Sequence, residues 1–241
     1  MRRLCCLILC PCLLWPQARA ASPEWGGSLT LASDNLMRGT SRSSSDPALS
    51  AELHAQHGSG WLGALWASTS HVRPTDPTVV DFGATLGYGA PLGDDWSLRA
   101  ALTHYESPWQ HRSSFYRYNE LAVDLRFREA LLFSVSFSPD TSRFASAYGP
   151  VWKRKALAYE ASWQQRLAGN LGGHAGIGYY DLSDLFGDGY WYGSAGLGWS
   201  RSGWQIDASY VIAGHGATAL SYVGDGGKRG LFSVAYAFSG R

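Results

Sequence analysis

Cysteine, net charge and long apolar runs are all scarce in this sequence of 241 residues. The four cysteines all lie close to the N-terminus, at Cys5, Cys6, Cys10 and Cys12. The rest of the chain therefore has neither a disulfide framework nor a thiolate metal site. The 20 basic and 19 acidic residues nearly balance, which argues against nucleic-acid binding, since that needs a basic face. No later window approaches 18 consecutive apolar residues, which excludes a helical membrane protein.

The first twenty residues have the three parts of a secretory signal peptide. Arg2 and Arg3 form a basic start, an apolar run follows from Leu4 to Trp15, and Ala18-Arg19-Ala20 resembles a cleavage site. The apolar run is shorter than the roughly 20 residues of a membrane-spanning helix. We therefore expect residues 1–20 to be a signal peptide that exports residues 21–241.

Glycine and aromatic residues are abundant, with 29 glycines and 14% aromatic residues. Chains with this composition and no low-complexity repeat are typically rich in β-strands, with glycine where strands bend or pack closely. Apart from the serine-rich stretch at 41–47, no linker divides the chain. We therefore predict one domain over residues 21–241.

Strict alternation of apolar and polar residues marks the strands. In VVDFGATLGYG, at 79–89, Val80, Phe82 and Leu86 fall on one face, while Asp81 and Thr85 fall on the other. A period of two is typical of a strand with one apolar and one polar face. The same pattern predicts twelve strands, at 28–34, 48–57, 61–71, 79–89, 96–105, 119–127, 131–138, 155–165, 171–180, 191–200, 204–212 and 230–238.

The connections between these strands alternate between short and long. Short ones lie at 58–60, 128–130 and 201–203, while long ones include 139–154 and 213–229. Outer-membrane barrels have short periplasmic turns, longer extracellular loops and an even strand count. We therefore predict an all-β fold, a transmembrane antiparallel up-and-down β-barrel of about 12 strands, within a range of roughly 10 to 14. The localisation is then the outer membrane of a Gram-negative cell.

Two sets of side chains follow from this fold. The first would line the lumen, because its members fall on the polar faces: Asp34, Glu52, Asp81, Arg99, Glu120, Asp124, Arg126, Glu160 and Asp207. The second would form an aromatic girdle at the membrane interface, because its members fall at strand ends on the short-turn side: Trp25, Trp61, Trp96, Phe127, Trp163, Trp199 and Trp204. A core of a soluble barrel would not collect tryptophans at strand ends.

The N-terminal third contains a distinctive run of residues within 31–68, namely Ser33, Asp34, Arg38, Gly39, Ser41, Pro47, Ala48 and Trp66 to Ser68. A second distinctive stretch covers 118–127 and is followed by FSPD at 137–140. In these residues the chain resembles a proteobacterial outer-membrane family known as Gcw_chp. The resemblance implies an outer-membrane β-barrel and no particular reaction or substrate.

For function, the sequence favours a passive pore for small polar or cationic solutes, because carboxylates predominate in the predicted lining and select cations. Pairing of these charges inside a closed, non-conducting barrel that acts through its extracellular loops is the alternative. A lipid-modifying enzyme is a weaker third candidate. The nearest approach to a catalytic cluster is His104 with Glu106 and Ser107. Its geometry is poor, because adjacent residues of a strand point to opposite sides. We expect no catalytic site, metal site or cofactor.

Two further interpretations concern partners and the first loop. The expected partners are outer-membrane lipid, the barrel-insertion machinery and small polar solutes, with no nucleic acid. Asp34 and Arg38 would lie at the outer mouth, either as an ion pair or ligand contact, or as residues that shape the strand end and cap a turn. The histidines His54 and His174 face inward without the paired spacing of a metal site.

Overall fold

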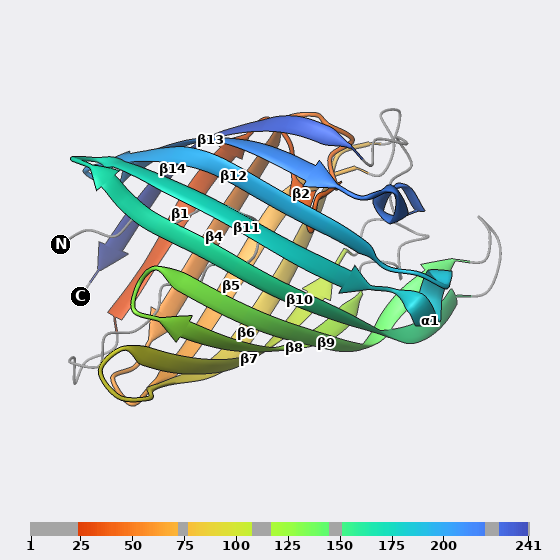
Figure 1. Ribbon diagram of the computed structural model, residues 1–241, viewed down its shortest axis with the longest axis horizontal. Coiled ribbons are helices and arrows are strands. Elements are labelled where there is room, and N and C mark those ends of the chain that lie inside the picture. Colours follow the sequence, from red (N-terminus) through yellow and green to blue (C-terminus); the bar gives the residue numbers. More distant parts are fainter. Residues whose placement is uncertain (1–23, 72–76, 108–116, 145–150, 220–226, 241) are drawn as a thin grey trace.

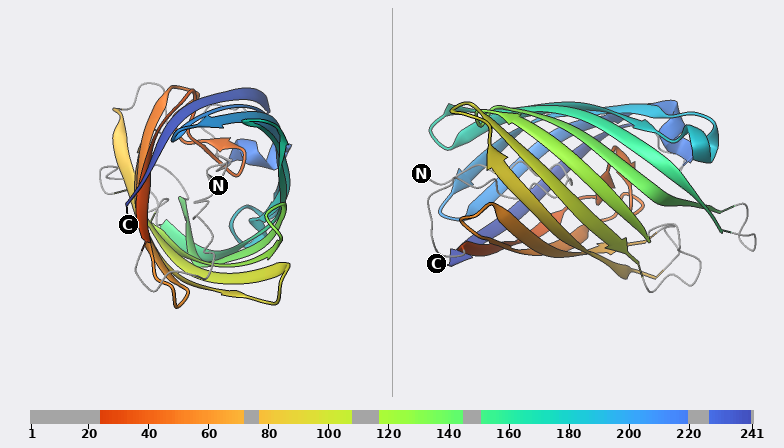
Figure 2. Two further views of the ribbon diagram at one scale, coloured as in Figure 1. Left: turned by 90° about the vertical axis from the view of Figure 1, so that its left-hand side faces the viewer. Right: turned by 90° about the horizontal axis from the view of Figure 1, so that it is seen from below.

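The computed structural model describes residues 24–71, 77–107, 117–144, 151–219 and 227–240. The expected signal peptide at 1–20 lies outside these residues. Twelve strands of the described part close into one antiparallel barrel, in which each pairs with its neighbours in the chain and β1 pairs with β14. Figures 1 and 2 show the closed ring, in which the start of β1 lies beside the end of β14. The predicted β-barrel of about 12 strands is confirmed.

The barrel strands match the predicted ones closely. Their bounds are β1 (Glu24–Ala32), β4 (Ala48–Gln56), β5 (Trp61–Ser70), β6 (Val79–Pro91), β7 (Trp96–Glu106), β8 (Tyr118–Phe127), β9 (Leu131–Phe144), β10 (Val151–Ala168), β11 (Leu171–Asp181), β12 (Tyr190–Arg201), β13 (Trp204–Ala213) and β14 (Lys228–Gly240). The alternating residues of β6 show why these segments are strands: Val80, Phe82 and Leu86 are exposed outside, whereas Asp81 and Thr85 are buried inside.

The two ends of the barrel differ. Short connections join β4 to β5, β6 to β7, β8 to β9, β10 to β11 and β12 to β13 at the end where β1 begins and β14 ends, which we call the turn end. The longer connections lie at the opposite end, the loop end. There the pairing of β9 with β10 extends to Phe144 and Val151, so both strands continue into the predicted loop at 139–154. That boundary was wrong because backbone pairing continues after the apolar alternation has ended.

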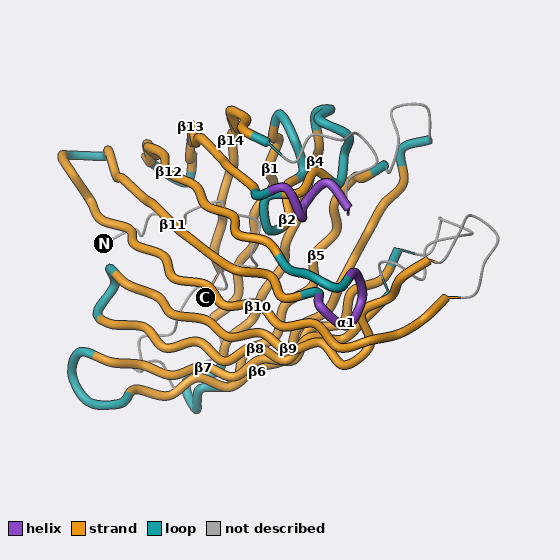
Figure 3. The backbone as a smooth tube through the Cα atoms, turned by 45° about the vertical axis from the view of Figure 1, so that its right-hand side comes forward, coloured by secondary structure: helices purple, strands orange, loops and turns teal. Residues whose placement is uncertain are grey.

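Two short helical segments lie in the connections of the loop end (Figure 3): α1 (Ser183–Phe186) and the 3₁₀ helix η2 (His215–Ala219). Leu182, which precedes α1, and Leu185 within it are almost completely buried, and they belong to one apolar cluster with Ala158 on β10 and Tyr180 on β11. Among the described residues, neither helical segment has the length and apolar character needed to cross a membrane.

The connection from β1 to β4 differs from the prediction most. Residues 33–47 were expected to continue the first strand and then form an outward loop. Instead they fold back inside the ring, where β2 (Leu36–Met37) and β3 (Thr40–Ser41) pair as a small hairpin. We call residues 33–47 the infolded segment.

Candidate functional site: the inside of the barrel and the infolded segment

The predicted lining residues lie on the inner face of the barrel or beside it. Asp81, Asp124 and Glu120 are buried there, together with Asp34, Arg99 and Asp207. Glu52, Arg126 and Glu160 are half-buried. All except Asp34 belong to barrel strands, whereas Asp34 lies in the bend after β1.

The tip of the infolded segment is a tight turn at Arg38 and Gly39. Both residues have positive φ, 49° and 78°, the combination that a two-residue hairpin turn of the primed type requires. Gly39 suits such a turn, and a Cβ at this position would meet the Cβ atoms of Ala213 and Tyr192 at 2.9 and 3.0 Å. The tip therefore lies directly against the inner wall formed by β12 and β13.

Among the described residues, three arginine–carboxylate ion pairs join the segment to three different barrel strands. Arg38 reaches Glu120 on β8 at 2.8 Å, and Arg42 reaches Asp81 on β6 at 2.7 Å. Asp34 accepts from Arg229 on β14 at 2.7 Å. Asp34 and Arg38, which the sequence placed together at the outer mouth, thus have different partners.

The interpretation that these residues shape a turn is partly correct, because Arg38 and Gly39 do form a turn, although it lies inside the barrel. Asp34 also accepts hydrogen bonds from the hydroxyls of Ser41 and Ser43, at 2.5 and 2.9 Å, and so closes the base of the segment.

Arg38 has a dense electrostatic environment. Its guanidinium lies over the Tyr180 ring, 4.6 Å from the centroid. Burial lowers the pKa of Arg38, but Glu120 together with Tyr180, Glu160 and Tyr192 outweighs this effect, and the pKa is raised well above its ordinary value. The guanidinium is therefore charged, and it neutralises one carboxylate of the inner wall.

Most remaining inner carboxylates also have partners. Arg99 binds Asp124 through Nε at 2.7 Å, and Nε2 of His174 lies 2.7 Å from Asp207. Two further contacts complete the set: Nδ1 of His54 lies 3.1 Å from Glu52, and the Tyr192 hydroxyl donates to Glu160 at 2.6 Å.

These pairings change the charge balance of the lining. The seven predicted carboxylates against Arg99 and Arg126 give −5, but Arg38, Arg42 and Arg229 reduce the sum to −2. Sequence reasoning missed Arg229 because the last strand begins two residues before the predicted start. Nothing in the sequence pattern indicated that Arg38 and Arg42 fold inward. The inner wall is thus only weakly acidic.

Inward glycines let large rings lie flat against the wall. A Cβ at Gly83 would approach the Trp66 indole at 2.6 Å, and one at Gly178 would approach the Tyr192 ring at 2.4 Å. The half-buried Trp66 ring also packs against Tyr105 at 5.6 Å. The close approach of Trp66 to Gly83 explains part of the glycine content, since a side chain at Gly83 would push the indole into the interior.

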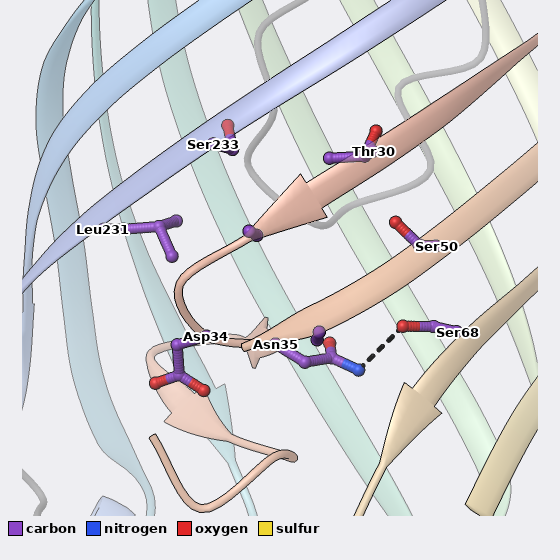
Figure 4. A pocket seen from close by; sticks show the side chains of 9 residues that line it. Thr30, Asp34, Asn35, Ser50, Ser68, Leu231 and Ser233 are labelled. Atoms are coloured by element: carbon purple, nitrogen blue, oxygen red, sulfur yellow. Dashed lines mark hydrogen bonds between the residues drawn. The ribbon is translucent and has the colours of Figure 1, made fainter. Parts of the chain in front are cut away.

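A small hollow lies on the inner wall beside the base of the infolded segment (Figure 4). Its lining comes from β1, β4, β5 and β14 and from the segment itself: Thr30, Ala32, Asp34, Asn35, Ala48, Ser50, Ser68, Leu231 and Ser233. Asn35 donates to the Ser68 hydroxyl at 2.9 Å and to the Thr69 carbonyl at 3.0 Å. These bonds fix the base of the segment to β5.

The side chains of His104, Glu106 and Ser107, the nearest approach to a catalytic cluster in the sequence, are not assembled. Nε2 of His104 lies 3.4 Å from Glu106 on the outer side, whereas the buried Ser107 hydroxyl donates to Asp81 on the inner side. A second cluster, which the sequence did not reveal, brings His174 between Asp207 and Ser209.

In that second cluster both Asp207 and Ser209 approach the same nitrogen, Nε2 of His174. A relay of nucleophile, base and carboxylate uses the two different ring nitrogens. The cluster therefore does not have relay geometry. Within the described ranges, no three His, Asp or Glu side chains are grouped so that they could hold a metal ion.

The predicted girdle residues lie on strands at the turn end. Trp25, Trp61 and Trp204 are about half exposed, and Trp96, Trp163 and Trp199 less so. Four of these tryptophans pack against an aromatic ring on a neighbouring strand: Trp25 with Phe238, Trp61 with Tyr88, Trp96 with Phe127 and Trp204 with Tyr236. Exposed leucines and valines occupy the outer face between the two ends.

No protein-family model and no curated protein matched the sequence. Among solved structures, the chain is similar to the NanC porin in a rhombohedral crystal form, with a TM-score of 0.57, 11% identity, and coverage of 90% of this chain and 99% of that one. It is also similar to the KdgM porin, with a TM-score of 0.54, 9% identity, and coverage of 89% and 99%. At these identities the similarity shows a shared porin-like fold.

Proposed function

We propose that this chain is a porin-like channel of the outer membrane through which small polar solutes diffuse, with a weak preference for cations. The observation that carries the proposal is the reversed distribution of polarity. Leu86 on the outer face is 60% exposed, whereas Asp81 on the inner face is 1% exposed. This arrangement suits a barrel surrounded by lipid and lined by polar groups.

The porin-like fold supports a channel, and one of its neighbours, the KdgM porin, has also been solved with disordered oligogalacturonate. For the present chain we propose a weak preference for cations, because the seven predicted lining carboxylates and the five arginines counted with them sum to about −2. The aromatic residues at the turn end would then lie in the interface on the periplasmic side. The last strand, with Phe232 and Tyr236 exposed, would be read by the insertion machinery.

The experiment is a planar-bilayer recording of the refolded protein under a salt gradient. Discrete conductance steps with a reversal potential that favours cations support the proposal, and a reversal potential that favours anions contradicts the charge preference. Glu160→Gln would test the lining directly, because Glu160 is half-buried and is held by the Tyr192 hydroxyl. We expect this variant to reduce the cation preference and leave the protein folded.

A second candidate is a non-conducting barrel that acts through its extracellular loops. The observation that favours it is the packing at the loop end, where the infolded segment and the residues beside α1 are buried inside the ring. A variant without the segment separates the two candidates. Because Ala32 pairs directly with Ala48, a two-residue Asn-Gly turn can replace residues 33–47 and close a hairpin.

If this shortened variant conducts, the barrel is a channel that the segment restricts. If the shortened variant is folded, inserted and silent, the second candidate is favoured.

We also propose that the chain belongs to the Gcw_chp family, on the residues of 31–68 that resemble it. The turn at Arg38 and Gly39 gives this resemblance a structural meaning, because both residues have positive φ. An alignment of related sequences in which Asp34, Arg38 and Gly39 vary freely would contradict the assignment.

A further inference from the structure

We propose that the infolded segment is a tethered plug of the loop end and that the ion pair between Arg38 and Glu120 is its latch. The proposal rests on the channel function proposed above and adds how the path through the barrel is closed. It follows from the difference between the contacts at the base of the segment and those at its tip.

The base of the segment is fixed by several hydrogen bonds. The backbone N–H of Asn35 donates to the Ser43 hydroxyl at 2.9 Å, and that of Arg42 donates to the Asn35 carbonyl at 2.7 Å. The His71 N–H, at the end of β5, donates to the Arg42 carbonyl at 2.9 Å. With Arg42 also bound to Asp81, the base forms one body with β5 and β6.

The tip has weaker contacts, with one exception. The Thr40 and Tyr190 hydroxyls lie 3.4 Å apart, and the Tyr118 hydroxyl lies 3.6 Å from the Met37 sulfur. Arg38, in contrast, combines an ion pair at 2.8 Å with Glu120 and a cation–π contact with Tyr180. Since breaking a buried ion pair leaves a charge without compensation, Arg38 dominates the attachment of the tip.

The contacts of the tip reach across the barrel. Glu120 lies on β8, Tyr180 on β11 and Tyr190 on β12, whereas the segment is rooted between β1 and β4. Both side chains of the pair are nearly dry, with exposed fractions of 6% for Arg38 and 8% for Glu120. A solute that crosses the loop end must therefore displace the tip or pass beside it.

The backbone at the tip is a left-handed turn that does not itself require an arginine. Arg38 has a φ of 49°, in the left-handed region where asparagine and glycine are favoured over residues with longer side chains. Strain at such a position persists where the surroundings hold it, and it is a reason to look for function. Here the strained residue is the one that reaches Glu120.

The main test replaces Arg38 by asparagine, which suits the turn and removes the latch. Arg128 offers a matched control, because it has nearly the same φ, 51°, but is exposed at the turn end and paired with Asp95. In planar bilayers we expect Arg38→Asn to raise the time-averaged conductance at least tenfold and Arg128→Asn to leave it unchanged. Glu120→Gln should act like Arg38→Asn, because it removes the charge of the other partner.

A disulfide provides the complementary test. The position of a Cβ at Gly39 lies 2.9 Å from the Cβ of Ala213, close enough for a bond after a small shift. Residues 21–241 contain no other cysteine, so no other thiol competes with this pair. Gly39→Cys with Ala213→Cys, combined with Arg38→Asn, should lose the raised conductance when oxidised and regain it on reduction.

The outcomes separate the latch from the channel. If the shortened variant without residues 33–47 conducts but folded Arg38→Asn equals the wild type, the channel function stands and the latch is wrong. If the oxidised protein conducts as well as the reduced one, tip movement does not control the path and the latch is also wrong. If the shortened variant is folded, inserted and silent, both proposals fail.

Discussion

A charge placed on the outer face of β6 tests the membrane assignment most directly. The position is Ala84, four residues from Val80 and four from Tyr88, whose side chains are exposed on the same face. Ala84→Arg adds the charge without removing a large apolar side chain. It therefore isolates the cost of a cation at this depth.

The expected magnitude follows from strand geometry. At about 3.4 Å per residue and a tilt of about 45°, four residues span roughly 10 Å along the barrel axis. Ala84 is then near the middle of an apolar band about 25 Å tall, where an arginine costs about 2–4 kcal/mol. The free energy of unfolding should fall by that amount.

The assay is equilibrium urea unfolding of the protein in liposomes, followed by tryptophan fluorescence. Ser162→Arg is the control, because Ser162 is half-buried on the opposite, inner face of β10, between the inward positions of Glu160 and Gln164. We expect it to change the unfolding free energy by less than about 1 kcal/mol, since lumen positions tolerate charge.

Equal destabilisation by Ala84→Arg and Ser162→Arg would refute the assignment of the two faces. A free energy of unfolding that is unchanged by Ala84→Arg would show that the outer face of β6 is not in hydrocarbon.

Two further predictions concern stability and use the same urea assay. Asp81→Ala leaves the Arg42 guanidinium buried without its carboxylate and should cost about 3–5 kcal/mol, whereas adding Arg42→Met should recover most of the loss; no recovery would mean that the pair itself is not the cause. Gly83→Ala forces the Trp66 indole from the wall and should cost about 1–3 kcal/mol. Gly230→Ala, where the added Cβ meets open space, should be nearly neutral, and equal effects at the two glycines would contradict the packing account.

Much of the barrel wall could be predicted because each strand carries its own signal. In β6 the alternation of Val80, Phe82 and Leu86 with Asp81 and Thr85 indicates both the strand and its two faces. The boundaries of β9 and β10 were predicted less well. These strands continue in TSRF and VWKRK, where pairing depends on backbone hydrogen bonds and the apolar alternation has stopped.

The inner site was less accessible to sequence reasoning. Strand parity identified Asp81, Glu120 and Asp124 as inward-facing, and the structure buries all three. It could not identify their partners. Glu120 meets Arg38 and Asp81 meets Arg42, from a segment that resembled an ordinary loop.

The sequence by itself determined the strands, their count and the polarity of each face, because these depend on residues two apart in the same strand. Only the tertiary structure decided where residues 33–47 lie and which charges meet. Arg38 and Glu120 are brought to 2.8 Å by closure of the whole ring, in which β1 pairs with β14. No local pattern encodes that closure, since it arises from the register of all twelve barrel strands of the described chain together.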